Sequence, residues 1–327
     1  MRVLSDSDYR LFERLVSLSQ KEMQKAMSQY LKSKYEKVIF TKDYLVAIGD
    51  IPIALVAHMD TVFKTPVSDL YYDQRKGVLW SPDGLGADDR AGIFAILKIL
   101  QDGYRPSVIF TTDEEQGGLG ASALASITPC PIPNLKYMIQ LDRRGSNDCV
   151  FYDCYCPEFV DYVESFGFCE KWGSFSDISF LMPAWKICGV NLSVGYEDEH
   201  SYTEILNVGP LYDTIKKVKK MLSEEKIPDF QYDELDAVYS SLWMKGDIYG
   251  QHCSKCKKLF SEYELFPVKG LDGKRKFYCP DCIVGNVDWC EVCQEAYEIT
   301  DPAESKQICK ECAEVVCTKT LKNNSKE

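Results

Sequence analysis

The chain has 327 residues, and its 50 Asp and Glu residues outnumber its 38 Lys and Arg residues, giving a formal net charge of −12. A hydrophobic content of 45% excludes a largely disordered chain and allows one sizeable core plus a smaller module. There are 26 Lys and Arg against 37 Asp and Glu up to Gly250, and 12 against 13 after it. This balance argues against nucleic acid as a partner, because phosphate binding needs a clustered basic surface.

From the given sequence we expect no targeting or membrane segment. The N-terminal residues MRVLSDSDYR contain no apolar run of signal-peptide length, and no stretch approaches the roughly 18 apolar residues that a membrane helix needs. We therefore expect a cytoplasmic protein without a membrane partner.

Residues 5 to 33 form the first predicted element. Their apolar side chains recur at mostly helical spacing and predict one surface helix, capped by Ser5 or Ser7. Predicted strands follow at 38–40, 44–49 and 51–60. The last of these, IPIALVAHMD, is apolar almost throughout, which is typical of a strand buried on both faces.

Strands and helices then alternate along the chain. Further helices are predicted at 90–102, 118–127, 157–166 and 209–224, and further strands at 107–113, 137–142 and 186–194. This alternation predicts an α/β fold with a mostly parallel sheet flanked by helices. We expect a main domain at 1–225, a connector at 226–250 and a small cysteine-rich module at 251–327.

Four segments at predicted strand ends or turns carry side chains that can bind metal. They are AHMD (57–60), GLGADDRAG (84–92), TTDEE (111–115) and LD (141–142). In open α/β sheets, ligand sites lie beyond the carboxyl ends of strands, so these segments are expected to converge. Taken singly, a His-x-Asp at a strand end is typical of a hydrogen-bonded pair, and an Asp-Glu-Glu run is typical of a solvated turn.

Histidine is rare in this chain, so the occurrence of two histidines after predicted strands favours a functional role for them. The three histidines are His58, His200 and His252. His58 ends the buried predicted strand, where an imidazole ring without a partner would be costly. His200 also follows a predicted strand, in the segment VGYEDEHS.

The order of these motifs resembles that of the co-catalytic zinc peptidases, the superfamily of zinc aminopeptidases, peptidase T and the aminoacylase and carboxypeptidase relatives. The resemblance covers about residues 50 to 220 and rests on AHMDTV, GADDRAG, TTDEEQGGLGA, QLDRRG and VGYEDEHS in family order. It implies that Asp88 bridges two metal ions. His58 and Asp142 would complete one site, and Glu115 and His200 the other.

The resemblance also assigns supporting roles. Asp60 would orient His58, the peptide between Asp88 and Asp89 would be cis, and Glu114 would be the general base. The nitrogen and oxygen ligands suit two catalytic zinc ions, and cobalt or manganese also fits. Two such ions lower the pKa of a bound water, whose proton Glu114 would pass to the leaving nitrogen. We therefore predict a di-zinc hydrolase that cleaves an amide bond of a peptide, as an aminopeptidase or a di- or tripeptidase does.

Asp142 and His200 are only 58 positions apart. The aminoacylase and carboxypeptidase relatives insert a lid or dimerisation domain between the corresponding residues. The interval here has room for about one helix and two strands, so we expect no lid.

Several residues near these motifs could contact the substrate. Asp177, Glu197 or Asp198 could receive a free amino group, although Asp177, like Ser176, is equally typical of a helix N-cap. Arg143 and Arg144 could bind a substrate carboxylate or neutralise the acidic cluster, and we favour the second.

Nine of the fifteen cysteines lie beyond residue 250, and eight of them form CxxC pairs. The pairs are Cys253/Cys256, Cys279/Cys282, Cys290/Cys293 and Cys309/Cys312. This spacing favours metal over disulfides and predicts two structural zinc ions in zinc-ribbon-like or treble-clef-like folds, paired in sequential or interleaved order. The metals would supply much of the folding energy of so small a module. His252 and Cys317 are not expected to be ligands.

Two alternatives stay open. The same chemistry could act on an N-acyl amino acid or another non-peptide amide. In a different class of function, the main domain would mainly bind while the zinc fingers recruit a protein, although the intact Glu114 disfavours this. The cysteine module could contact a protein partner or could simply stabilise the chain.

Overall fold

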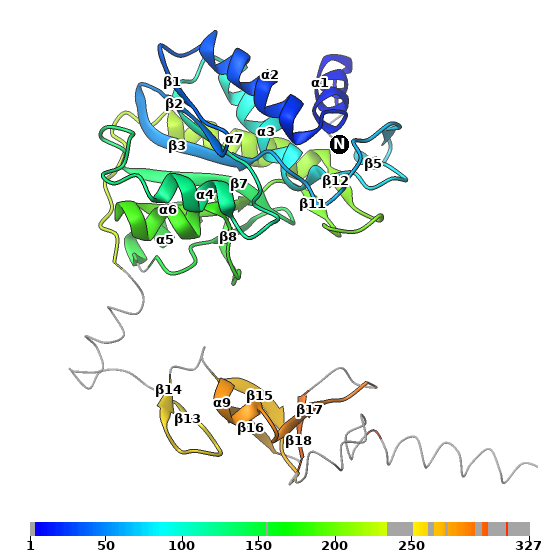
Figure 1. The fold of residues 1–327 in the computed structure, drawn as a ribbon, viewed down its shortest axis with the longest axis vertical. Helices are drawn as coiled ribbons and strands as arrows, with labels where there is room; N and C mark the ends of the chain where they lie inside the picture. Colours follow the sequence, from blue (N-terminus) through cyan, green and yellow to red (C-terminus); the bar gives the residue numbers. More distant parts are fainter. Residues whose placement is uncertain are drawn as a thin grey trace, which may run out of the picture. The chain divides into compact units, whose positions relative to one another are not determined.

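The computed structural model describes residues 4–154, 156–233, 251–260, 265–271, 274–291 and 296–299, together with Cys312. The chain divides into a first unit, Met1–Val238, and a second unit, Tyr239–Glu327 (Figure 1). Within the described residues, no helix is long and apolar enough to cross a membrane.

The first unit is built on an eight-stranded sheet with the strand order β1-β2-β6-β3-β7-β10-β8-β9. The four strands at its centre, β6, β3, β7 and β10, are mutually parallel. Strands β2 and β8, which flank them, are antiparallel to their inner neighbours. The strands of this sheet are β1 (Lys37–Phe40), β2 (Tyr44–Ile48), β3 (Ile51–His58), β6 (Pro106–Thr111), β7 (Tyr137–Arg143), β8 (Asp148–Val150), β9 (Cys169–Glu170) and β10 (Cys188–Ser193).

Helices cover both faces of this sheet (Figure 1), which confirms the predicted α/β fold. Helices α3 and α7 pack on one face, with α1 against α3, and α4 and α6 pack on the other. The central strands are buried on both faces because their sequences are almost continuously apolar. The helices are α1 (Asp6–Val16), α2 (Gln20–Lys32), α3 (Ala87–Gln101), α4 (Leu119–Ala125), α5 (Pro157–Glu164), α6 (Asp177–Trp185) and α7 (Val208–Leu222).

The prediction of one helix over residues 5 to 33 is wrong, because the chain breaks between α1 and α2. Ser19 forms a capping box with Glu22: its hydroxyl accepts from the Glu22 N–H, and its own N–H donates to the Glu22 carboxylate at 3.0 Å. A capping box starts a new helix rather than continuing an old one. The predicted cap at Ser5 is present, since its hydroxyl accepts from Asp8 N at 3.2 Å.

A second, four-stranded sheet in this unit was not predicted. Its order is β11-β12-β5-β4. Its strands have two or three residues each, too few to show alternation in the sequence. They are β4 (Tyr71–Asp73), β5 (Val78–Trp80), β11 (Tyr196–Glu197) and β12 (Ile205–Asn207).

The interval between Asp142 and His200 holds more structure than predicted. It contains α5 and α6 where one helix was expected, because a nine-residue helix starting at Asp177 was overlooked. The strands β8, β9 and β10 of this interval belong to the main sheet. Apart from β11, which belongs to the second sheet, the strands of the interval are therefore part of the main α/β core.

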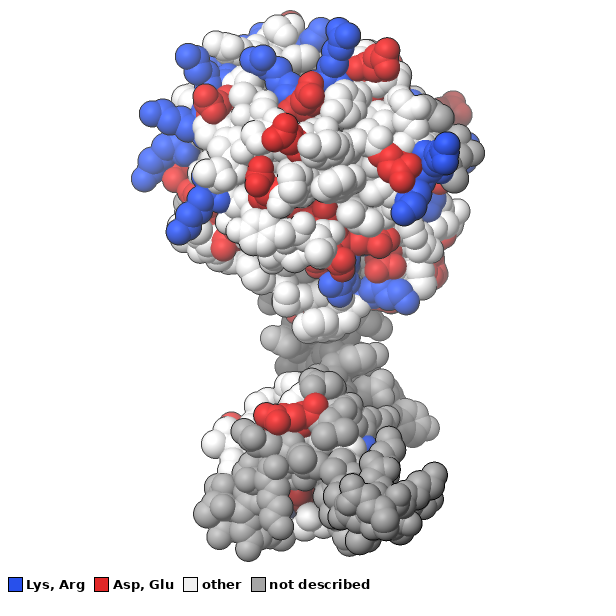
Figure 2. All heavy atoms as spheres, turned by 90° about the vertical axis from the view of Figure 1, so that its right-hand side faces the viewer, with Lys and Arg blue, Asp and Glu red and all other residues white. Residues whose placement is uncertain are grey.

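One face of the first unit carries Asp and Glu side chains over its central part, with Lys and Arg mostly toward the margins (Figure 2). This distribution agrees with the excess of acidic residues before Gly250.

The described part of the second unit is small and has two sheets. Strand β13 (Gln251–His252) pairs with β14 (Leu259–Phe260), and a four-stranded sheet has the order β16-β15-β18-β17. Its buried core is limited to two small groups, one around Leu265 and one around Tyr297. The remaining elements are β15 (Phe266–Lys269), β16 (Arg275–Tyr278), α9 (Pro280–Ile283), β17 (Val287–Trp289) and β18 (Ala296–Glu298).

Candidate metal centre

A first group of potential ligands lies where β3 and β7 end side by side. His58 is the last residue of β3 and is almost fully buried. Its Nε2 lies 3.0 Å from Asp88 Oδ1 and 3.7 Å from Asp142 Oδ1. Adjacent parallel strands carry His58 and Asp142 to the same edge of the sheet, as expected for such a fold. The three side chains could hold a metal ion.

A second group shares Asp88 with the first. The other carboxylate oxygen, Asp88 Oδ2, lies 3.2 Å from His200 Nε2, and His200 Nε2 lies 3.0 Å from Glu115 Oε2. Asp88, Glu115 and His200 could hold a further metal ion. Asp88 therefore turns one oxygen to each group.

The backbone around Asp88 departs from the helix that follows it. Asp88 and Asp89 have non-helical φ and ψ inside α3, and the peptide between them is cis, as the resemblance implied. The Asp89 carboxylate accepts from the backbone N–H groups of His58 at 3.2 Å and Gly92 at 2.8 Å. These bonds tie the end of β3 to the start of α3.

Asp60 connects the first group to the turn after β6. Its Oδ1 lies 3.3 Å from His58 Nδ1 and accepts from Glu114 N at 3.1 Å, while its Oδ2 accepts from Glu115 N at 3.0 Å. A carboxylate behind a metal-binding imidazole usually fixes the ring orientation. Here the same carboxylate also fixes the backbone that carries Glu114 and Glu115.

Glu114 is buried beside the two groups and lines a cavity of about 390 Å³. Burial raises the pKa of Glu114 to about 9, and the nearby charges of Asp142, Asp177 and Asp88 add to this, while His58 opposes it. The cavity is lined by Val62, Asp88, Glu114, Glu115, Asp142, Arg143, Arg144, Tyr152, Gly173, Ser174, Phe175, Asn191, Tyr196, Glu199 and His200.

The electrostatics of the two groups suit cations. Burial, and then the charge of Asp88, raise the pKa of Glu115 to about 7, and the same two causes raise the pKa of Asp142. Burial alone would lower the pKa of His58, but hydrogen bonds with Asp142, Asp60 and Asp88 outweigh it and raise that pKa. The buried Glu115 Oε1 has no hydrogen-bond partner. Clustered carboxylates with an unpartnered oxygen fit divalent ions, whose charge would favour the ionised forms.

The contacts that hold Asp142 in place were not predicted from the sequence. Its Oδ2 accepts from Ser176 Oγ at 2.7 Å, its Oδ1 accepts from Tyr196 OH at 3.1 Å, and its backbone N–H donates to Asn191 Oδ1 at 3.0 Å. Asn191 offered a signal in the sequence, since it is a polar residue within the apolar run of β10.

Glu204 was also missed. Its side chain is buried and accepts from Gly86 N at 2.7 Å and from Asp88 N at 3.0 Å. Burial raises the pKa of Glu204 to about 8. Glu204 therefore holds the loop that presents Asp88, and nothing in its local sequence indicated this, because its partners lie more than a hundred positions away.

The three candidates for binding an amino group do not line the cavity. Asp177 is the first residue of α6 behind the N-cap Ser176; it is fully buried and accepts from Thr111 Oγ1 at 2.6 Å. Glu197 accepts from Asn207 Nδ2 at 3.1 Å, and Asp198 is exposed. The carboxylate that lines the cavity from this segment is Glu199, which forms a 3.0 Å ion pair with Arg144.

These features define the site of the first unit: in an α/β domain, one aspartate lies between two His-carboxylate groups at the carboxyl edge of a parallel sheet. The sequence profile described as Peptidase family M28 matches residues 46–156, which include His58, Asp88, Glu115 and Asp142. A search of curated proteins found no match.

Two solved structures have a similar fold. One is a tripeptidase from Staphylococcus aureus subsp. aureus Mu50, with a TM-score of 0.51 and 15% identity over 66% of this chain and 97% of that one. The other is a TET aminopeptidase from a marine sediment thaumarchaeon, with a TM-score of 0.53 and 14% identity over 72% of this chain and 99% of that one. These structures confirm the predicted fold, and the match to the peptidase family profile agrees with the prediction of a zinc-dependent peptidase.

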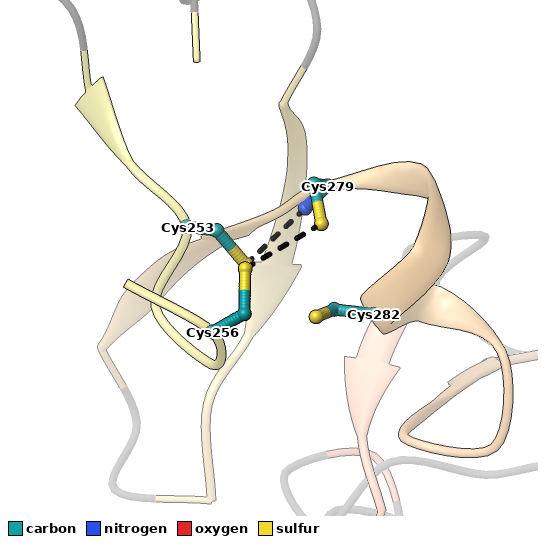
Figure 3. A group of neighbouring side chains, drawn as sticks. All are labelled: Cys253, Cys256, Cys279 and Cys282. Carbon is teal, nitrogen blue, oxygen red and sulfur yellow. Dashed lines mark hydrogen bonds between the residues drawn. The ribbon is translucent and has the colours of Figure 1, made fainter. Parts of the chain in front are cut away.

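The second unit contains a four-cysteine cluster (Figure 3). Cys253 and Cys256 lie between β13 and β14, Cys279 and Cys282 lie at the start of α9, and the four sulfur atoms face one another. Cys256 Sγ lies 3.9 Å from Cys279 Sγ, and Cys279 N donates to Cys253 Sγ at 3.4 Å. Burial acts to raise the pKa of Cys253, but backbone donors, the first being Cys279 N, outweigh it and lower the pKa to about 6.

This arrangement joins the first two CxxC pairs in sequential order. The order of elements is that of a treble clef. The β13–β14 hairpin carries Cys253 and Cys256, the β15–β16 hairpin follows, and α9 carries Cys279 and Cys282 at its start. Cys290 and Cys312 belong to one small cluster with Tyr297. Cys293, Cys309 and Cys317 lie outside the described residues, as does the side chain of His252.

Proposed function

We propose that the first unit is a di-zinc hydrolase that cleaves an amide bond of short peptides. The observation that carries this proposal is the position of Asp88, whose two carboxylate oxygens face His58 and His200 separately. Asp88 would be shared by two ions, with His58 and Asp142 on one and Glu115 and His200 on the other. Peptides are favoured as substrates because the two similar structures are named a tripeptidase and an aminopeptidase.

When bound, two divalent ions supply Lewis-acid polarisation of the scissile carbonyl and a water of lowered pKa. The chain supplies proton transfer. Glu114 lines the same cavity as members of both ligand groups, where its carboxylate can first accept a proton from water and then give it to the leaving nitrogen.

Three positioning roles complete this proposal. Asp60 would hold the His58 ring and the backbone of Glu114 together through its two oxygens. Glu204 would hold the loop before Asp88, and Ser176 would orient Asp142. These contacts would hold the proposed general base and the proposed ligands in one arrangement, which is what catalysis by positioned groups requires.

The test uses the purified full-length protein with a library of dipeptides, tripeptides and N-acyl amino acids. We expect turnover that a chelator removes and zinc restores, and that is lost in Glu114→Ala while the zinc content stays unchanged. Turnover of none of these substrates, or turnover that persists in Glu114→Ala, would rule out the proposed mechanism. Selective turnover of N-acyl amino acids would change the substrate but keep the chemistry.

For the second unit we propose structural zinc. One ion would be held by Cys253, Cys256, Cys279 and Cys282, which fits the tetrahedral thiolate sites that zinc prefers. A second ion at the other two CxxC pairs stays a prediction, as does a cytoplasmic location.

We also propose that this unit contacts a protein rather than nucleic acid, since Val284 and Phe266 are exposed apolar side chains and the charges after Gly250 are nearly balanced. Deletion of residues 251–327 with no loss of any captured protein would contradict this contact.

A further inference from the structure

Arg143, the last residue of β7, carries a guanidinium that has no carboxylate partner in the described part of the chain. It lines the cavity together with Glu114 and His200. Its Nη2 donates to the backbone oxygen of Trp172 at 3.2 Å, and its buried Nε has no acceptor. An arginine in this state has donor capacity left for a bound group.

Its neighbour Arg144 provides a contrast within the same cavity. Arg144 Nη1 lies 3.0 Å from Glu199 Oε1, so this guanidinium is already paired. From the sequence we favoured neutralisation of the acidic cluster as the role of both arginines. Arg144 forms such an ion pair, whereas Arg143 forms none with a described carboxylate.

The cavity also lacks the feature that an amino terminus would need. A free amino group requires an available carboxylate, and the expected candidates Asp177, Glu197 and Asp198 do not line the cavity. Its remaining carboxylates are Glu114, the proposed metal ligands, and Glu199, which is paired with Arg144. A substrate carboxylate, in contrast, would be repelled by this acidic cavity except where a cation meets it.

We propose that Arg143 binds the free carboxylate of the substrate, on the side of the leaving amine. This inference rests on the proposed amide hydrolase. The substrate class would then be dipeptides and N-acyl amino acids, in which the residue released by hydrolysis carries a free α-carboxylate. Arginine suits this role because its planar donors match a carboxylate.

The size and lining of the cavity agree with a small substrate. A volume of about 390 Å³ is near the lower end for ligand pockets. Val62 and Phe175 line it with partly exposed apolar surface, which could contact the side chain of the residue that carries the carboxylate.

The first experiment compares Leu-Phe with Leu-Phe amide on the zinc-loaded full-length protein. These substrates share the scissile bond and differ only in the terminal carboxylate. We expect Arg143→Gln to lower kcat/KM for Leu-Phe by about tenfold to a hundredfold, mainly through KM, because a charge-assisted hydrogen bond is lost. The amide should change less than about twofold, and Arg143→Lys should recover part of the loss. Arg144→Gln is the matched control and should affect the two substrates alike.

A binding experiment separates this inference from the proposed reaction. Calorimetry of Leu-Phe and Leu-Phe amide with the zinc-loaded Glu114→Gln protein needs no turnover. A preference for the free carboxylate that Arg143→Gln removes would support the role of Arg143 even if the parent protein hydrolysed neither compound. Equal losses on both substrates, or a carboxylate preference that persists in Arg143→Gln, would overturn the inference while leaving the hydrolase itself standing.

Discussion

The two units of this chain differ in what holds them together. The first has one large apolar core running through the sheet and its helices, with many fully buried side chains such as Leu55, Phe94 and Phe110. The described core of the second is limited to groups such as Cys253, Leu265 and Cys279. Domains with so little apolar burial usually need metals or disulfides to fold.

Because of this difference, we expect bound metal to have a different role in each unit. In the first, the ligand side chains lie at the edge of a fold that is already stabilised by its core, so metal would serve chemistry. In the second, two of the four clustered thiols, Cys253 and Cys279, are themselves part of the small buried core, so metal would serve folding. The following changes test this contrast.

The largest effect is expected from Cys279→Ser, which removes a thiol from the centre of the cluster. Zinc binding supplies about 10 kcal/mol or more to small zinc modules, so the second unit should unfold while the first keeps its thermal transition. Limited proteolysis should then cleave after residue 250 and leave the first unit intact. The exposed Cys169 gives the control Cys169→Ser, which should change neither unit. Unfolding of both units together would contradict the contrast.

Glu114→Gln should lower kcat by about 10² to 10⁴-fold, because the amide cannot accept a proton from water. The thermal transition and zinc content should match those of the parent protein, since Glu114 belongs to neither ligand group. Steady-state kinetics with a dipeptide measure the loss. A variant that retained parental kcat would show that another group transfers the proton.

Asp60→Asn is expected to act through His58 and the turn that carries Glu114. The amide keeps one acceptor oxygen, so one of the two bonds to the Glu114 and Glu115 N–H groups is weakened, and the His58 ring loses its charged partner. Zinc affinity or activity should fall by about 10 to 100-fold, which is typical for such partners. Zinc titration with a competing chelator measures the affinity, and parental values for both quantities would rule out the positioning role.

The smallest effect concerns the stability of the first unit alone. Asp8 accepts from Lys98 Nζ at 2.7 Å and also from the Tyr212 hydroxyl. Burial acts to raise the pKa of Asp8, but these bonds outweigh it and lower the pKa. Asp8→Asn should therefore cost about 1 to 2 kcal/mol at pH 7.

The pH dependence of that cost has a definite sign. A carboxyl whose folded pKa is lowered stabilises the fold above its ordinary pKa, near 4, and loses this contribution as the pH falls through the lowered value. The difference between parent and Asp8→Asn in urea unfolding should be constant from about pH 5 to 7 and shrink at lower pH. A difference that grew on acidification would contradict the assignment.

Much of this architecture could be read from the sequence because the relevant signals are local. The apolar runs of β3 and β7 mark buried strands, and the polar residues His58 and Asp142 at their ends mark the edge where a site forms. The CxxC spacing likewise marks the thiol cluster, although only the structure shows that the first two pairs join.

The missed features depend on contacts between distant segments. Glu204 reaches the loop before Asp88 across more than a hundred positions, and Asp177 turned out to face Thr111 in the core rather than the cavity. Burial of a carboxylate cannot be read from neighbouring letters, because it depends on which strands lie side by side. The hydrogen bonding of Arg143 could not be predicted from the sequence for the same reason, since its acceptor is a backbone carbonyl of the segment before α6.

The central claim is that Asp88 is shared by two ions. The most direct test is the zinc content of the purified full-length protein and of Asp88→Ala, measured by mass spectrometry of the metal after gel filtration, with circular dichroism to show that the variant is folded. The account predicts that the variant binds two zinc ions fewer than the parent and keeps the zinc of the second unit. A loss of one ion, or of none, in a folded variant would contradict the shared position of Asp88.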